Sequence, residues 1–187
     1  AMAVREHPRF AAELADPATI ELLYKSAPLH DIGKVGIPDH ILLKPGKLTA
    51  DEWVIMQTHA KRGSDAIEQA ERDIEMPLEF LSVAKEIAHR HHEKWDGSGY
   101  PDGLTGDAIP ISARLMALAD VFDALISVRV YKPAMSYAEA RQIIAAGRGK
   151  HFDPDVTDAF LAGFDEFVAI AERYRDDGEA AGTGSRQ

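Results

Sequence analysis

The sequence predicts an all-α fold, a single helical bundle, and three observations lead to this prediction. Apolar residues recur three and four positions apart along most of the chain, as they do on the inner face of an amphipathic helix. Two stretches, TADE at 49–52 and SYAE at 136–139, have the pattern of capping boxes that start helices. Runs with the alternating pattern of β-strands are scarce. With 187 residues, 45% of them apolar, the chain is long enough to bury one core.

The chain is predicted to have three parts. Residues 1–18 are expected to be an N-terminal segment that holds a truncated first helix and begins with a cloning remnant, AMAV. Residues 19–175 are expected to form the helical domain. Residues 176–187, with the sequence DDGEAAGTGSRQ, are expected to form a disordered tail.

Helices are expected where the apolar repeat persists between helix-breaking residues. Pro28 should kink or restart the first helix, and two prolines and two glycines make 35–47 a loop. Four glycines do the same for 96–109. The helix from 110 to 127 is apolar on most sides and is therefore expected at the centre of the bundle. The predicted helices cover residues 19–34, 49–63, 65–72, 77–92, 110–127, 136–147 and a last stretch from 153 past 167.

Composition excludes several kinds of function. The chain has no cysteine, which excludes disulfides, zinc–thiolate sites and thiol nucleophiles. Its net charge of −10 disfavours nucleic acid as a partner, because duplex binding depends on many lysine and arginine contacts. A small anionic ligand is still compatible, since a few cations can reverse the field within one cleft. No apolar run could span a bilayer and no signal peptide is visible, so we expect a cytoplasmic protein without a membrane partner.

Polar residues lie beside the apolar faces of the first two predicted helices. His30 and Asp31 end an apolar stripe, and Lys34 is placed one helical turn after His30. A solvated helix end is the ordinary explanation for such a pair. His59 lies beside the apolar face of the capped helix, where a lone histidine is usually a hydrogen-bonded core residue.

Two further groups lie on the helices that follow. His91 and His92 lie at the end of one helix, where the helix dipole stabilises a cationic histidine. His89 is expected to take no part in a metal site, as a bystander. Asp120 stands in the most apolar helix, with Asp123 on the same face. A buried carboxylate needs a partner, so Asp120 bonds a backbone amide or an arginine, or it binds a metal.

Together these groups are the inventory of a dinuclear metal site in a helical bundle. Imidazole and carboxylate side chains would come from four successive helices, as in other bundle proteins with metals in the core. Mixed ligands of this kind suit iron, manganese or zinc, and the absence of thiolates does not choose between these metals.

Five stretches of the chain resemble one known family. HDIGKVGIP, LLKPGKL, THA, HHEKWDGSGYP and ALADVFDALISVRVYK resemble, in order and spacing, the HD-GYP family, a branch of the HD-domain metal phosphohydrolases. The resemblance covers roughly residues 19–165 and implies an HD-type helical bundle with a metal site in its core. It implies hydrolysis of cyclic di-GMP, a bacterial second messenger, to linear pGpG, GMP or both. It also implies two divalent ions, iron or manganese in first place and zinc or nickel in second.

The resemblance assigns roles to individual residues. Asp31 and Lys34 would be catalytic, with Lys34 near the scissile phosphate. Tyr100 belongs to the signature loop and would stack on a guanine, although a packing role is equally compatible with its position. The signature loop is Gly99, Tyr100 and Pro101, and the phosphate-binding residues are Arg129 and Lys132. The metal ligands are His30, Asp31, His59, His91, His92 and Asp120.

The chain departs from the family in one respect, and two other functions stay open. Family members carry a glutamate and a histidine, four residues apart, on an earlier helix; Glu6 and His7 are adjacent and too close to His30 to match them.

The alternative functions are a general HD-type nucleotide phosphohydrolase and a non-catalytic signalling module. The expected partners are cyclic di-GMP, an upstream receiver domain, GGDEF-type signalling proteins and a second copy of the chain.

Overall fold

The structure, a computed structural model, describes residues 1–73, 79–128 and 134–182. Within these ranges it is helical and has no β-strand, only two isolated bridges, so the all-α prediction is confirmed. The α-helices are α1 (Ala11–Leu14), α2 (Pro17–Ser26), α3 (Asp39–Leu42), α4 (Ala50–Asp73), α5 (Glu79–Arg90), α6 (Ile111–Ile126), α7 (Tyr137–Ala146), α8 (Pro154–Ala162) and α9 (Phe164–Gly182). Four short 3₁₀ helices are η1 (Met2–Val4), η2 (Ala27–Leu29), η3 (Ile32–Gly36) and η4 (Gly106–Ala108).

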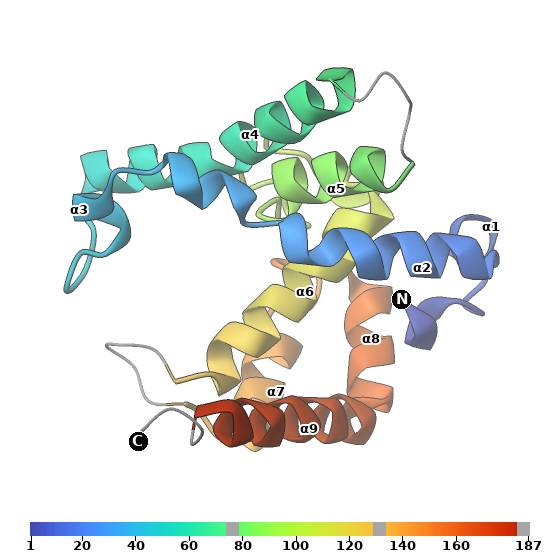
Figure 1. Ribbon diagram of the computed structural model, residues 1–187. Helices are drawn as coiled ribbons and strands as arrows, with labels where there is room; N and C mark the ends of the chain where they lie inside the picture. The colour runs from blue at the N-terminus through green and yellow to red at the C-terminus, as the bar shows by residue number, and fades with distance from the viewer. Residues whose placement is uncertain (74–78, 129–133, 183–187) are drawn as a thin grey trace.

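Helix α6 crosses the centre of the domain, as its apolar sequence predicts. Figure 1 shows α2, α4 and α5 on one side of it and α7, α8 and α9 on the other. The larger core packs around α6 and includes Phe122 and Phe160, whose rings meet edge to face at 5.2 Å. A smaller core lies between α4 and α5, around Ile67 and Leu81.

Both ends of the chain join helical structure. Val4, Phe10 and Leu14, within residues 1–18, are buried in the larger core against α6 and α8. At the other end, α9 continues to Gly182, into the range that we expected to be a disordered tail. Residues 183–187 lie outside the described residues.

Several predicted helix boundaries were wrong. The first helix ends at Ser26 and is followed by two 3₁₀ helices, η2, which contains Pro28, and η3, so the regular helix is interrupted at the proline as expected. The predicted loop 35–47 contains α3. The last helix is divided at Gly163 into α8 and α9. Pro77, expected in a first helical turn, lies outside the described residues.

Gly63 does not end a helix. It lies within α4, where it lets another segment of the chain approach closely. Helix α4 runs without a break through the two helices that were predicted over 49–72. A Cβ atom built on Gly33, in η3, would lie 2.0 Å from the carbonyl oxygen of His59 and 2.4 Å from the amide nitrogen of Gly63. The two glycines thus let η3 lie directly on the backbone of α4, which places Asp31 near His59.

Replacing Gly33 with alanine is expected to destabilise the domain by about 1–3 kcal/mol, the usual cost of overpacking. The added methyl group would meet backbone atoms of α4, which cannot swing away as a side chain can. Urea unfolding measures the change, and Gly36→Ala is the matched control. Gly36 is in the same 3₁₀ helix, but the nearest atoms to a Cβ there belong to the flexible side chain of Arg62, at 3.2 Å. Equal stability of the two variants would contradict this close-approach role of Gly33.

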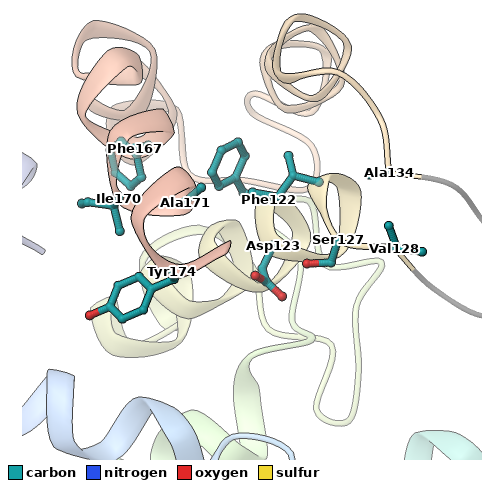
Figure 2. A pocket seen from close by; sticks show the side chains of 10 residues that line it. Phe122, Asp123, Ser127, Val128, Ala134, Phe167, Ile170, Ala171 and Tyr174 are labelled. Carbon is teal, nitrogen blue, oxygen red and sulfur yellow. The ribbon is translucent and has the colours of Figure 1, made fainter. Parts of the chain in front are cut away.

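A cavity of about 580 Å³ lies between the C-terminal half of α6 and α9. Figure 2 shows Phe122 and Phe167 on its apolar side and Asp123 at its polar edge. Asp123 is exposed, so this carboxylate, predicted to share a face with Asp120, needs no buried partner. In the part of the chain that the structure describes, none of the helices combines the length and the apolar character needed to cross a bilayer.

Candidate metal centre

Four segments bring the predicted metal ligands together. The turn between η2 and η3 supplies His30 and Asp31, and α4 supplies His59. The residues just after α5 supply His91 and His92, because the chain leaves the helix after Arg90. Helix α6 supplies Asp120.

Asp31 lies at the centre of the cluster. Its Oδ1 atom is 3.5 Å from His59 Nε2 and 3.8 Å from His91 Nε2. Its Oδ2 atom is 3.3 Å from His30 Nε2, and it also accepts a hydrogen bond from the Lys34 ammonium. Ligand atoms of four residues, Asp31, His59, His91 and His92, all lie within 4.8 Å of one another. Asp120 joins the cluster through His30, whose Nε2 atom is 3.8 Å from Asp120 Oδ1.

Backbone carbonyl groups orient three of the four imidazoles. The Nδ1 atom of His30 lies 2.9 Å from the oxygen of Ala27, and that of His59 lies 2.7 Å from the oxygen of Met56. The Nδ1 atom of His91 lies 3.0 Å from the oxygen of Ile87. Because a carbonyl oxygen can only accept, each of these Nδ1 atoms carries a proton, and the Nε2 atoms of neutral His59 and His91 present lone pairs to the cluster.

These lone pairs fit a cation. His91 Nε2 and Asp31 Oδ1 are buried and have no hydrogen-bond partner within the described residues. The Nε2 atoms of His59 and His92 lie 3.1 Å apart, so the lone pair of His59 Nε2 faces the Nε2 atom of His92. Buried acceptors without partners are costly unless a proton or a metal ion satisfies them. The donor set of imidazole and carboxylate groups is suited to a divalent transition metal.

Burial keeps most of the cluster histidines neutral, which is the form that binds metal. It lowers the pKa of His59, and with the charge of His30 it lowers the pKa of His91 to about 4. Burial and the neighbouring His91 also lower the pKa of His92. For His30, burial is outweighed by the hydrogen bond and charge of Asp31, and its pKa is raised. Burial would likewise raise the pKa of Asp31, but its bonds from His30 and Lys34 lower it.

The metal-free domain is therefore expected to lose stability as the pH falls from 7.5 to 5.5. Below pH 6.5 the unfolded chain protonates His59, His91 and His92, whereas the folded chain resists this down to lower pH. The loss for His91 alone is on the order of 1–2 kcal/mol at pH 5.5, by linkage. His30 works in the opposite direction because its raised pKa favours the folded state at lower pH, and the carboxyl group of Asp31 titrates below this window.

Urea unfolding in the presence of a chelator, at pH 7.5, 6.5 and 5.5, measures this effect. His91→Gln should flatten the pH dependence, whereas His40→Gln, at an exposed position of α3, should leave it unchanged. A wild-type stability that rises as the pH falls across this window would contradict the expectation.

The signature loop folds back onto the histidine pair through a buried carboxylate. Glu93 is only 2% exposed and accepts hydrogen bonds from the amides of Asp102, Gly103 and Leu104, at 2.7, 3.2 and 3.0 Å. At Gly99 the chain passes so close that a Cβ atom would lie 2.3 Å from the amide nitrogen of Lys94. Sequence reasoning missed Glu93, although an acidic residue followed by a glycine-rich loop with many free amides is a usable signal.

This folding places Tyr100 against the cluster. Its ring stacks on His92, with centroids 4.8 Å apart and planes at 29°, and it lies 6.5 Å from the ring of His59. Burial and the charges of Asp31 and Asp120 raise the pKa of Tyr100. Its hydroxyl group therefore stays protonated in the physiological range and can donate a hydrogen bond.

A second buried polar network, also missed from the sequence, holds Trp95. The guanidinium groups of Arg9 and Arg114 lie 5.0 and 5.9 Å from the Trp95 ring. Both arginines also contact Asp153, which is 2% exposed and caps α8. The loop is thus fixed to the N-terminal segment, α6 and α8. Trp95 therefore has a packing role.

The remaining predicted residues divide into two groups. Lys34 lies in the cluster through Asp31, and Gly99, Tyr100 and Pro101 lie in the loop beside it. Arg129 and Lys132, predicted to hold substrate phosphates, lie outside the described residues. His89 contacts Asp102, with its Nε2 atom 3.2 Å from Oδ2, and not the cluster residues, as a bystander would.

Comparisons with known proteins show which family this chain belongs to. The family model described as "HD domain" matches residues 8–156. A cyclic di-GMP phosphodiesterase of Vibrio cholerae is 62% identical over 87% of this chain and 33% of its own length. The cyclic di-GMP phosphodiesterase response regulator RpfG of Xanthomonas campestris is 49% identical over 83% of the chain and 39% of its own length.

A third relative has a different named substrate. The 3'3'-cGAMP-specific phosphodiesterase 2 of Vibrio cholerae is 49% identical over 83% of the chain and 29% of its own length. The chain therefore spans about a third of the length of these curated relatives. The matched domain and the converging histidine and aspartate side chains lead to one conclusion: this chain belongs to the HD-domain family, in its HD-GYP branch.

Proposed function

We propose that this domain is a metal-dependent phosphodiesterase that hydrolyses cyclic di-GMP to linear pGpG, GMP or both. The observation that carries the proposal is the convergence of imidazole nitrogens on Asp31, where His91 Nε2 and Asp31 Oδ1 are buried and have no hydrogen-bond partner within the described residues. Two relatives named cyclic di-GMP phosphodiesterases support a cyclic dinucleotide as the substrate class. A nucleotide with two phosphodiester groups is an anion, which the acidic surface of this chain would accept only at a local cluster of cations.

The proposed ligands are the six that the sequence indicated: His30, Asp31, His59, His91, His92 and Asp120. Two divalent ions, with iron or manganese as the first choice, would polarise a phosphoryl oxygen and make water a better nucleophile. Asp31 would hold both ions because its two oxygens face different histidines. Lys34 would offset charge on the phosphoryl group, since its ammonium lies beside Asp31 and its side chain is 40% exposed. Arg129 and Lys132 would bind the substrate phosphates.

The proposal extends to the longer protein that such a domain serves. One relative is named a response regulator, so an upstream receiver domain and a cytoplasmic location are the setting that we infer. A GGDEF-type partner and a homodimer stay predictions of the family resemblance.

A substrate comparison tests the proposal. The chain would be loaded anaerobically with Fe²⁺ or with Mn²⁺, its metal content measured by mass spectrometry, and cyclic di-GMP, 3'3'-cGAMP and GTP offered at equal concentration. We expect cyclic di-GMP to be cleaved fastest. Preference for GTP would identify a general nucleotide phosphohydrolase, preference for 3'3'-cGAMP would correct the substrate, and a loaded but inactive chain would identify a non-catalytic signalling module.

A further inference from the structure

Trp53 is a half-exposed tryptophan close to the metal centre. It lies in the first turn of α4, six residues before His59, and 48% of it is exposed. Its ring meets the ring of Tyr100 edge to face, with centroids 6.3 Å apart and planes at 85°. Within the described residues it is not one of the groups that could hold a metal. A large aromatic side chain left partly in water beside the metal centre suggests a contact with the ligand.

Tyr100 connects Trp53 to the metal centre. One neighbour of the tyrosine ring is His92, in a stacked contact at 4.8 Å, and another is Trp53. The three rings thus follow one another from a partly buried histidine of the cluster to the protein surface. Because the planes of Tyr100 and Trp53 are nearly perpendicular, the two rings form a corner with two aromatic walls.

Hydrogen bonds hold the backbone that carries both walls of this corner. The capping box at the start of α4 is complete: Thr49 and Glu52 exchange hydrogen bonds, and Glu52 also holds Lys44 at 2.5 Å. The amide of Trp53 donates to the carbonyl oxygen of Thr49, at 2.9 Å. Tyr100 is held by the loop that the Glu93 carboxylate closes. Fixed walls reduce the entropy lost when a ligand binds.

We propose that Trp53, whose ring meets the Tyr100 ring edge to face, is a stacking surface for one guanine base of the substrate. The inference rests on the proposed function, because that function places a phosphodiester at the metal centre and a purine one sugar away from it. Stacking on tryptophan suits guanine, whose large π face needs no specific hydrogen-bond partner there. Trp53 is then a specificity residue that favours purine dinucleotides.

A protein-docking surface is the competing interpretation of Trp53. Val54 and Ile55, the next two residues of α4, are 62% and 38% exposed. A docking surface would use these aliphatic side chains together with the indole. The aromatic contact with Tyr100, by contrast, singles out Trp53, so Val54 provides a matched control on the same helical turn.

The kinetic test compares Trp53→Ala, Trp53→Phe and Val54→Ala in the metal-loaded chain with cyclic di-GMP. We expect Trp53→Ala to raise KM roughly tenfold, within the range for loss of one stacked base, with a smaller change in kcat. Trp53→Phe should recover most of the affinity, and Val54→Ala should match the wild type. An unchanged KM in Trp53→Ala would overturn the inference. Melting curves show whether each variant is folded.

A binding test separates this inference from the proposed function. The chain has two tryptophans, so Trp95→Phe leaves Trp53 as the only indole reporter. GMP should quench its fluorescence with saturation, and ribose 5-phosphate, which lacks a base, should not. Quenching in a chain that fails to hydrolyse cyclic di-GMP would support the stacking surface while refuting the phosphodiesterase. Turnover without quenching, or equal quenching by both ligands, would overturn the stacking surface alone.

Discussion

Replacing Asp31 with alanine is expected to remove the bound metal and to lower phosphodiesterase turnover by at least about 10³-fold, since metal ions supply several kcal/mol of transition-state stabilisation. Asp31 is the carboxylate that three imidazoles share, with oxygen–nitrogen distances of 3.3 to 3.8 Å. Without it only one carboxylate of the proposed ligands, Asp120, is left to offset the charge of a divalent ion. The remaining neutral nitrogens cannot replace that charge.

Metal content after dialysis and turnover of cyclic di-GMP are measured on the same preparation. Asp31→Asn keeps the shape of the side chain and removes its charge, so it should lose metal nearly as completely as Asp31→Ala. Asp123→Ala is the control, because Asp123 lies on α6 with Asp120 but is exposed and lines the separate cavity beside α9. Full metal content in Asp31→Ala would refute the site assignment.

Local sequence signals predicted the parts of the fold that depend on local physics. The capping box at Ser136 starts α7, and the side chain of Asp153 accepts the amides of Asp155 and Val156 at the start of α8. Pro28 ends the regular helix before it. These features require only neighbours within one helical turn. The apolar character of 111–126 likewise predicted its central position, and eight of its residues are buried.

Boundaries that depend on distant contacts were not predictable in the same way. Glycine is a residue type that often ends helices, yet α4 continues through Gly63. Its role there is to let η3 approach closely, and only the three-dimensional contact with Gly33 reveals this role. Asp120 and Asp123 share a sequence environment, but one approaches His30 and the other lines a cavity. The two aspartates are only three residues apart on an apolar helix. Their different surroundings depend on which neighbouring segments cover each face of that helix.

The family resemblance indicated which residues to expect in the candidate site, but not which other residues hold them in place. His30, Asp31, His59, His91, His92 and Asp120 stand at positions that the family resemblance assigns, and the structure places them together. The family resemblance assigns no role to Glu93 or Trp53. Glu93 acts on amides nine to eleven residues further along, and Trp53 meets Tyr100 across 47 positions of sequence. Such roles emerge only when the loop is closed.

Replacing Lys34 with alanine is expected to leave the metal in place and to lower kcat by about 10²- to 10³-fold, the usual effect of removing one donor that stabilises transition-state charge. Its bond to Asp31 contributes little to stability, because the lysine side chain is 40% exposed and such pairs contribute about 0–1 kcal/mol. With a divalent ion held by Asp31, the Lys34 ammonium would pair less strongly with that carboxylate and would be available to the phosphoryl oxygens.

The pair of variants Asp31→Ala and Lys34→Ala therefore separates metal binding from charge stabilisation. Lys34→Arg keeps the positive charge and should recover part of the rate. Lys61→Ala, which removes an exposed lysine paired with Asp65 on α4, should change neither metal content nor kcat. If Lys34→Ala lost as much metal as Asp31→Ala, the lysine would act by orienting the carboxylate. A lysine that contacts the phosphate must instead lower kcat at constant metal content, because its partner in the transition state is the substrate and not the metal site.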